Sequence, residues 1–577
     1  MALAATPALI RLPVWRARFV VFALVAAFGV LLARSVYLQA VKTDFLQMKG
    51  ESRFSRVIEV PATRGRVLER GGEAVAISTP VRSIWAIPED VSTQAKPEQL
   101  RKLALLLGAD GKDLERKLAD TSRDFVYLKR QIPPEQAERI AELGVPGVYA
   151  HREFRRYYPG GEVMAHVIGF TGVEDAGQEG IELAFQDTLA GKSGSRRVIK
   201  DRMGRIVEDI ESIRGAQDGR DITLSVDGKI QNIAFGALKS AVEANKAKAG
   251  AIVVLDVRTG EVLALANLPT YNPNNRGKLT GAQLRNRVMT DLFEPGSTAK
   301  PLTVALALDA GKVTPDTVIQ TASGTLTISD RTIRDAHPGG NMSVAQVIQK
   351  SSNVGTAKIA LSMPREQMWD MFKKVGFGAA PALGFPGEAH GKVRDWKTWR
   401  PIEQATMSYG YGLSVSLIQL ARAYSVFARD GEMVPLTLTR TDMPVAGKQV
   451  ISAETARAMR AMLELAVQPG GTAPRARVMG YRVAGKTGTA HKLEGGGYAA
   501  KKYVSSFVGF GPVSDPRLVI AVMIDEPSAG QYYGGAVAAP VFSQVMQGAL
   551  RRLGVAPDAP MQPIELPGEG EEVKESI

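Results

Sequence analysis

A serine and a lysine stand three residues apart, at Ser297 and Lys300, in the stretch FEPGSTAKPLTVALALDAG. Residues at this spacing share one face of a helix, so the hydroxyl and the amine can touch. The preceding FEPG turn brings the serine to a helix N-terminus, where free backbone N–H groups favour an oxyanion. Burial or a second cation would lower the pKa of the lysine enough to make it a base. The pair predicts a serine nucleophile, although a capping serine beside a solvated lysine has the same pattern.

Two later motifs favour the catalytic interpretation. Ser297 is the only serine followed by lysine three positions on, Ser351-Ser352-Asn353 contains the only S-x-N, and Lys486-Thr487-Gly488-Thr489 precedes a strand pattern. The order S-x-x-K, S-x-N, K-[ST]-G is that of the active-site motifs of serine penicillin-recognising enzymes. A second K-S-G, at residues 192–194, lies before the serine and leads into two arginines. We interpret it as a turn.

The middle motif offers a proton relay and an amide clamp. Ser351 can pass a proton toward a leaving amine, and the Asn353 side chain can both accept from and donate to a substrate amide. Serine and asparagine are also common at helix caps, which is the alternative interpretation of this motif.

The last motif suits an extended peptide with a carboxylate end. An edge strand at Thr489 can pair with a peptide by strand addition, and Gly488 lets the backbone approach closely. Lys486 offers charge, while Thr487 and Thr489 offer hydroxyls to a carboxylate. The N–H groups of Ser297 and Thr489 together would form an oxyanion hole.

The chain resembles the class B penicillin-binding proteins, and more narrowly the division-specific septal transpeptidases often called penicillin-binding protein 3. The resemblance covers nearly the whole chain, through segments such as RGRVLERGG, YYPGGEVMAHVIGFTG, GQEGIE, QKSSNVGTAKIAL, GFPGEAHG and AGKTGTAHK. It implies that Ser297 attacks the penultimate D-alanine carbonyl of a stem pentapeptide and releases terminal D-alanine. An amine of a neighbouring stem peptide then resolves the acyl-enzyme, and β-lactams inhibit the reaction. The same resemblance places four tyrosines near the cleft: Tyr409, Tyr503, Tyr532 and Tyr533.

Three functions compete for these motifs. A cross-linking transpeptidase uses an amine acceptor, a carboxypeptidase or β-lactamase admits water, and a non-enzymatic sensor or scaffold only binds. A scaffold is not expected to keep Ser297, Lys300 and Lys486, and a small hydrolase needs neither an anchor nor a long pedestal. We therefore favour the transpeptidase. By resemblance, its partners include the polytopic septal glycan polymerase and other division membrane proteins.

The N-terminus predicts a membrane anchor. Three arginines lie within residues 1–18, an uncharged run follows from 19 to 33, and Arg34 comes next. That run is shorter than the roughly 20 residues of a span, so Arg34 must reach an interface for residues 19–41 to cross. No cleavage-like site follows, and the basic flank predicts a cytoplasmic N-terminus with the catalytic part exported. We expect a single-pass protein of the inner (cytoplasmic) membrane with a periplasmic catalytic domain.

The remaining chain reads as a multidomain α+β protein. We expect an α+β pedestal over residues 42–219, of the dimerisation type by resemblance, and a transpeptidase domain over 220–555. In the latter, residues 249–267 read as two strands joined by a turn, and YVSSFVGFGP and RLVIAVMID as two more. Strands at both ends of this domain, with helices between them, predict one sheet assembled from distant segments. The resemblance implies that this sheet is antiparallel and that the domain has a serine β-lactamase-like fold. Residues 556–577 are rich in Pro and Glu, so we expect a disordered tail.

Other classes lack support in the sequence. The formal charge is +13, but the basic residues are scattered and show no zinc-finger spacing, so we expect no nucleic acid. Cysteine is absent, the five histidines form no H-E-x-x-H, and no G-x-S-x-G elbow occurs. We expect no metal and no cofactor.

Overall fold

The computed structural model describes residues 13–42, 55–200, 206–336, 338–441, 443–564 and 575. The chain divides into two compact units. Unit 1 takes in residues 1–62, 82–153 and 192–218, and unit 2 takes in residues 63–81, 154–191 and 219–577. Strands β3 (Ala74–Ala86) and β5 (Val148–Tyr157) each contribute to both units.

The N-terminal helix α1 (Val14–Val36) continues as a π-helical turn, η1 (Tyr37–Val41). Within residues 14–40, an 18-residue window reaches a mean hydropathy of 2.3, and no part of that window is buried by protein. A helix of this length and composition can cross a bilayer. The expected anchor at residues 19–41 falls almost wholly within it.

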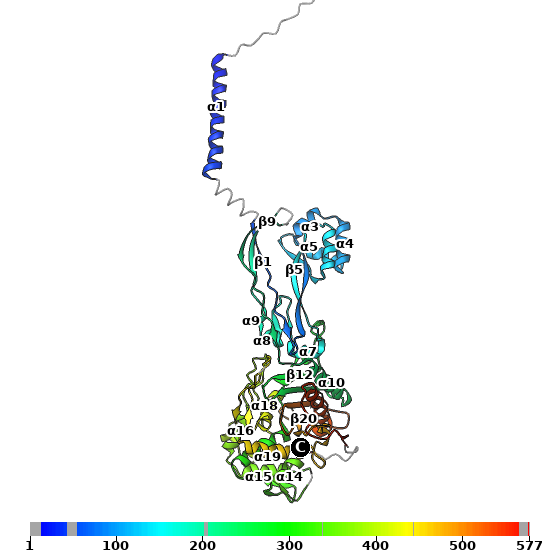
Figure 1. Cartoon of the computed structure of the whole chain (residues 1–577). Helices are drawn as coiled ribbons and strands as arrows, with labels where there is room; N and C mark the ends of the chain where they lie inside the picture. The colour runs from blue at the N-terminus through cyan, green and yellow to red at the C-terminus, as the bar shows by residue number, and fades with distance from the viewer. Residues whose placement is uncertain are drawn as a thin grey trace, which may run out of the picture. The chain divides into compact units, whose positions relative to one another are not determined.

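Unit 1 contains a helical lobe and a separate sheet. In the lobe, α5 contacts α3 and α4, and α6 contacts α4 (Figure 1). The apolar faces of these short helices form one hydrophobic core with strand β4. Its buried residues include Leu103, Leu107 and Ile140. The antiparallel sheet has the order β1-β8-β9. The elements of unit 1 are α3 (Pro88–Gln94), α4 (Pro97–Leu107), α5 (Gly111–Leu118), β4 (Val126–Ile132), α6 (Pro134–Glu142), β1 (Ser55–Val60), β8 (Gly194–Lys200) and β9 (Ile206–Arg214).

Two segments of the expected pedestal, residues 63–81 and 154–191, belong to unit 2. Their buried side chains Val67, Ile168 and Leu189 share a hydrophobic core with the central sheet. Buried Glu182 accepts hydrogen bonds of 2.6 Å from both Arg64 and Arg156. Such a buried charged group is stable only when it is fully paired, so these ion pairs tie the two segments together. The elements here are β2 (Val67–Leu68), α7 (Gly161–Ile168), β6 (Phe170–Thr171), β7 (Gly177–Glu179), α8 (Gly180–Ala184), α9 (Gln186–Leu189) and β10 (Ile222–Thr223).

The central sheet of unit 2 has five antiparallel strands in the order β12-β11-β21-β20-β19. Strands β11 (Ala249–Asp256) and β12 (Val262–Leu268) form the predicted hairpin, and β19 (Ala484–Glu494), β20 (Gly497–Gly511) and β21 (Leu518–Asp525) come from the far end of the domain. This confirms the prediction of one sheet from distant segments. Strand β19, which carries the K-T-G-T motif, lies at the edge.

Helices cover both faces of this sheet. Helices α10 (Gly228–Ala244) and α21 (Ala539–Arg552) contact one face, where Ile520 and Val522 point, and α18 (Leu417–Ala428) contacts the other, where Val519 and Ala521 point. Strand β21 is buried along its whole length because alternate residues enter two different cores. That explains its continuous apolar sequence.

A mainly helical region joins the two ends of the sheet (Figure 1). Its core helix α13 packs against α15, α16 and α19. The elements are α11 (Gly281–Leu284), α12 (Arg287–Thr290), η2 (Gly296–Ala299), α13 (Lys300–Asp309), β13 (Val318–Gln320), β14 (Thr325–Ile328), β15 (Arg331–Arg334), β16 (Asn341–Ser343), α14 (Val344–Lys350), α15 (Asn353–Leu361), α16 (Arg365–Lys374), η3 (Trp396–Thr398), α17 (Pro401–Met407), β17 (Glu432–Met433), β18 (Lys448–Gln449), α19 (Ala453–Leu465) and η4 (Pro474–Ala476). Helix α20 (Gly534–Val537) follows strand β21 and contacts α21, β19 and β20.

Part of the C-terminal tail that we expected to be disordered is tied to unit 2. Asp558 accepts from the backbone N–H of Arg482 at 2.7 Å, and Ala559 N–H donates to the carbonyl of Gly480. Further along, Glu575 is buried. Composition alone misses these contacts because each depends on one polar group meeting a fixed partner.

Candidate active site

Ser297 lies in a single 3₁₀ turn, η2, that runs directly into helix α13. The expected helix start is therefore tighter than a regular α-helical turn. Gly296 has a φ of 54°, a left-handed conformation that favours glycine. A Cβ at Gly410 would lie 2.2 Å from the carbonyl oxygen of Gly296, so two glycines let this turn pack closely. Ser297 is largely buried.

Lys300 is completely buried one turn after Ser297. Its Nζ donates to the carbonyl oxygen of Ser351 at 2.6 Å and to the hydroxyl Oγ of Ser351 at 3.0 Å. Lys300 is therefore not the solvated lysine that the alternative, capping interpretation requires. The amine is instead held against the second motif.

Ser351 links the first motif to the third. Lys486 is also completely buried, and its Nζ donates to Ser351 Oγ at 2.9 Å. The hydroxyl oxygen has two acceptor positions, both filled by lysines, which leaves the O–H free to donate. Ser351 adopts a left-handed conformation with φ 59° after helix α14, which turns its side chain between the two amines.

The pKa values of both lysines are lowered. For Lys300, burial lowers the pKa well below its ordinary value, and the neighbouring Lys486 charge lowers it further. Burial lowers the pKa of Lys486 to about 8, while the carboxylate of Glu575 opposes the shift. Two buried ammonium groups on one hydroxyl repel each other, so the neutral form of Lys300 is favoured. This is the perturbation that the S-x-x-K interpretation requires.

The other residues of the middle motif divide between structure and binding. Ser352 is the N-cap of α15: its Oγ accepts from Gly355 N–H at 2.8 Å and donates to Asp335 at 2.7 Å. The cap interpretation thus fits Ser352. Asn353 donates to the carbonyl of Arg334, but its buried Oδ1 has no hydrogen-bond partner among the described residues. An unpaired buried acceptor is costly unless a ligand satisfies it.

A groove of about 560 Å³ adjoins Asn353. It is lined by residues of strand β15 and helix α17, together with Tyr409. Tyr409 is largely buried and meets Tyr411 edge to face at 5.9 Å. The structure thus places one predicted tyrosine beside Asn353.

The third motif lies on edge strand β19, against the serine turn. A Cβ at Gly488 would lie 2.8 Å from the carbonyl oxygen of Pro295 and 2.6 Å from Ser506 Oγ, so no larger residue fits without a shift. Thr487 Oγ1 donates to Thr472 Oγ1 at 3.0 Å. Thr489 Oγ1 accepts from Gly534 N–H at 3.0 Å and donates to Glu575 at 2.7 Å. The hydroxyls of Thr487 and Thr489 are thus both hydrogen-bonded to neighbouring polar groups.

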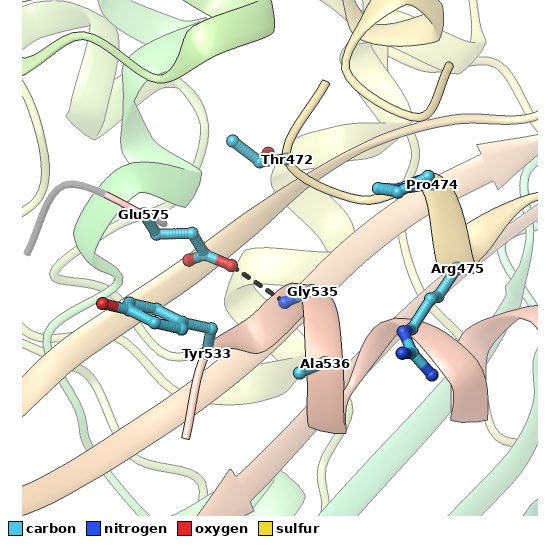
Figure 2. A pocket seen from close by; sticks show the side chains of 7 residues that line it. All are labelled: Thr472, Pro474, Arg475, Tyr533, Gly535, Ala536 and Glu575. Atoms are coloured by element: carbon cyan, nitrogen blue, oxygen red, sulfur yellow. Dashed lines mark hydrogen bonds between the residues drawn. The ribbon is translucent and has the colours of Figure 1, made fainter. Parts of the chain in front are cut away.

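Three of the four predicted tyrosines form one aromatic group. Tyr503 and Tyr532 stack with ring centroids 4.2 Å apart, and Tyr533 meets Tyr532 at 4.5 Å. The His491 ring packs on Tyr503, with ring centroids 4.9 Å apart. Tyr533 lies beside Glu575 and Thr472 (Figure 2).

Sequence reasoning missed two carboxylates. Asp335 holds the start of α15 through Ser352 and Val354 N–H, and its charge opposes the lowering of the pKa of Lys300. Glu575 bonds to Thr489, although it lies in a tail expected to be disordered. Neither stands in a recognisable motif. Across the described part of the chain, no group of three or more His, Cys, Asp or Glu side chains could hold a metal ion.

Comparisons with known proteins agree with this geometry. Residues 250–547 match the penicillin-binding protein transpeptidase domain, and residues 59–224 match the penicillin-binding protein dimerisation domain. The chain is 44% identical to the probable peptidoglycan D,D-transpeptidase PenA of Neisseria gonorrhoeae, over 95% of this chain and 94% of that protein. It is 41% identical to the peptidoglycan D,D-transpeptidase FtsI of Escherichia coli (strain K12), over 94% and 93%.

A solved structure gives the same assignment. The transpeptidase domain of Burkholderia pseudomallei penicillin-binding protein 3 is 52% identical, with a TM-score of 0.55, covering 58% of this chain and 98% of that one. The expected α+β fold and the expected family are both confirmed. This chain belongs to the penicillin-binding protein family of peptidoglycan D,D-transpeptidases.

Proposed function

We propose that this chain cross-links stem peptides of the septal cell wall through a serine acyl-enzyme, with Ser297 as nucleophile and Lys300 as its base. One observation carries the assignment: Ser351 Oγ accepts hydrogen bonds from both Lys300 and Lys486, at 3.0 and 2.9 Å, with all three side chains fully buried. Three motifs far apart in sequence thus share one proton-transfer network.

Acylation begins with the hydroxyl proton of Ser297. Neutral Lys300 takes that proton as Ser297 Oγ attacks the carbonyl carbon of the penultimate D-alanine. The carbonyl oxygen becomes an oxyanion, which the backbone N–H groups of Ser297 and Thr489 stabilise. A Cβ built on Gly296 would lie 3.6 Å from Thr489 O, so the two backbone segments are close enough to share one oxyanion.

The leaving group needs a proton in return. The C–N bond to terminal D-alanine breaks as its nitrogen takes a proton from Ser351 Oγ, whose own proton is replaced through the adjoining lysines. The ester of Ser297 remains. In the second half, an amine of a neighbouring stem peptide attacks the ester carbonyl carbon and forms the new amide bond. The C–O bond to Ser297 breaks, and the proton lost by the amine reaches Ser297 Oγ through the same groups. No cofactor takes part.

Substrate binding uses the groups around this network. Asn353 Oδ1 accepts from an amide N–H of the donor peptide, which pairs with edge strand β19 beside Gly488. Lys486, Thr487 and Thr489 bind the terminal carboxylate. The tyrosines at 409, 503, 532 and 533 border the bound peptide.

Hydrolysis is the second fate of the acyl-enzyme. Glu388 lies in the GFPGEAHG loop, which resembles a cleft-bordering segment but has the pattern P-G-E-A rather than the E-x-x-x-N of the hydrolytic enzymes. Its Oε1 accepts from Phe385 N–H at 2.8 Å within its own loop, while its buried Oε2 has no hydrogen-bond partner among the described residues. An amine acceptor held in the cleft is favoured over water by its high effective concentration.

We further propose that α1 anchors the chain in the inner membrane, with the N-terminus cytoplasmic and the transpeptidase domain periplasmic. The exposed apolar surface of α1 and the three arginines within residues 1–18 support this orientation. The pedestal would position the transpeptidase domain and contact the glycan polymerase and other division proteins of the membrane.

The nucleophile is tested by covalent labelling. Full-length protein in detergent is treated with a fluorescent penicillin, and the acylated residue is located by mass spectrometry. Ser297→Ala should abolish labelling and leave the fold intact, because one hydroxyl at a helix start contributes at most about 2 kcal/mol. Undiminished labelling of that variant would refute the assignment.

A further inference from the structure

We propose that the C-terminal tail carries an internal competitor for the active site, in which the Glu575 carboxylate occupies the position of the terminal carboxylate of the stem peptide. This inference rests on the proposed function, which assigns that position to Lys486, Thr487 and Thr489. The tail would then regulate access of substrates and β-lactams to Ser297.

The contacts of Glu575 are those of a bound carboxylate ligand. The residue is 2% exposed. Its Oε2 accepts from Thr489 Oγ1 at 2.7 Å, and its Oε1 accepts from the backbone N–H of Gly535 at 2.8 Å. Figure 2 shows the side chain turned toward Gly535, with Tyr533 and Thr472 beside it. Both oxygens are thus held by unit 2.

The charges around Glu575 also suit an anion. Its carboxylate opposes the lowering of the pKa of Lys486 and of Lys300, and the Lys486 charge in turn opposes the effect of burial on Glu575. A docked tail therefore also changes the electrostatic environment of the two lysines. Its charge shifts Lys300 toward the protonated form, although burial and the Lys486 charge still hold the pKa of Lys300 well below its ordinary value.

The cavity that adjoins Glu575 is too small for a second carboxylate. The cavity lined by Thr472, Tyr533, Gly535 and Glu575 measures about 10 Å³, which holds about one water molecule. Two carboxylates at one site would also repel each other. Substrate and tail must therefore bind in turn.

The tail has the composition of a removable ligand. Residues 556–577 are rich in Pro and Glu, a composition that does not favour a stable fold of their own. A segment of the same chain is present at an effective concentration in the millimolar range, so modest affinity suffices for occupancy. Loss of one carboxylate should release it.

The test compares acylation rates in full-length protein in detergent. Glu575→Gln keeps the size of the side chain and removes its charge, and Glu571→Gln removes the same charge from the same tail. With a fluorescent penicillin below saturation, Glu575→Gln should be acylated about three- to tenfold faster than the parent, as expected when a minor competent state becomes the major one. Glu571→Gln should match the parent.

A second arm supplies the tail in trans. Protein truncated after Ile564 should be acylated as fast as Glu575→Gln. A synthetic peptide of residues 569–577 should slow the truncated protein, and the same peptide with glutamine at 575 should not. Equal rates in parent, Glu575→Gln and truncated protein would overturn the inference while leaving the proposed function intact. Equal acceleration by both glutamine variants would overturn it as well, and failure of every form to label would refute the proposed function.

Discussion

Replacing one of two adjacent serines should separate catalysis from helix capping. Ser351→Ala removes the oxygen that accepts from both Lys300 and Lys486, whereas Ser352→Ala removes the cap of α15 and a bond to Asp335. The two variants delete the same atom type from neighbouring buried positions. Only the first lies on the proton route.

The expected magnitudes differ. General acid–base groups contribute about 10²–10⁴ to a rate, so Ser351→Ala should slow acylation by about that factor. In Ser351→Ala, Lys300 still donates to the carbonyl oxygen of residue 351, and Lys486 keeps its weak contacts to Thr487. The free energy of unfolding should therefore fall by only about 1.5–3 kcal/mol, roughly the contribution of one hydrogen bond to a charged group. Ser352→Ala should cost about 0.5–2 kcal/mol of stability as a lost cap, with acylation nearly unchanged.

The assay is stopped-flow acylation by a chromogenic β-lactam, with urea unfolding of the same samples. Folded Ser351→Ala that acylates within about threefold of the parent, far short of the loss a general acid–base group accounts for, would refute the proton-relay argument. So would equal slowing by the two variants, because that would trace the effect to the shape of the loop.

Three further predictions follow from the site. The acylation rate should have a bell-shaped dependence on pH. It should fall as pH decreases through the lowered pKa of Lys300, because Lys300 must be neutral, and it should fall again above about pH 8, where Lys486 loses its proton. A single transition near the ordinary lysine pKa of 10.5 would contradict the lowered pKa values. Gly488→Val should slow acylation and lower the free energy of unfolding by about 1–3 kcal/mol, because its Cβ would lie 2.8 Å from Pro295 O and 2.6 Å from Ser506 Oγ; Gly497→Val, where nothing lies within 4 Å, is the matched control in both assays. The penicilloyl-enzyme should lose its label with a half-life of minutes to hours, a barrier of about 21–23 kcal/mol, followed by intact mass after removal of free drug; turnover above about one per second would indicate a hydrolase.

Features that depend on neighbouring residues could be predicted from the sequence. The β11–β12 hairpin follows from two apolar runs and the turn at residues 258–260. The candidate catalytic residues could also be predicted from the sequence, because Ser297, Ser351 and Lys486 belong to short motifs whose order is itself informative.

Only the tertiary structure decided how these residues meet. Lys300 and Ser351 are 51 residues apart, and Ser351 and Lys486 are 135 apart, so no local pattern predicts that one oxygen accepts from both amines. Their pKa values depend on complete burial, which is a property of the packed domain. Glu575 shows the same limit most clearly. Its tail has a composition typical of disorder, and its role depends on a single carboxylate meeting Thr489 and Gly535, partners brought together by the folding of distant segments.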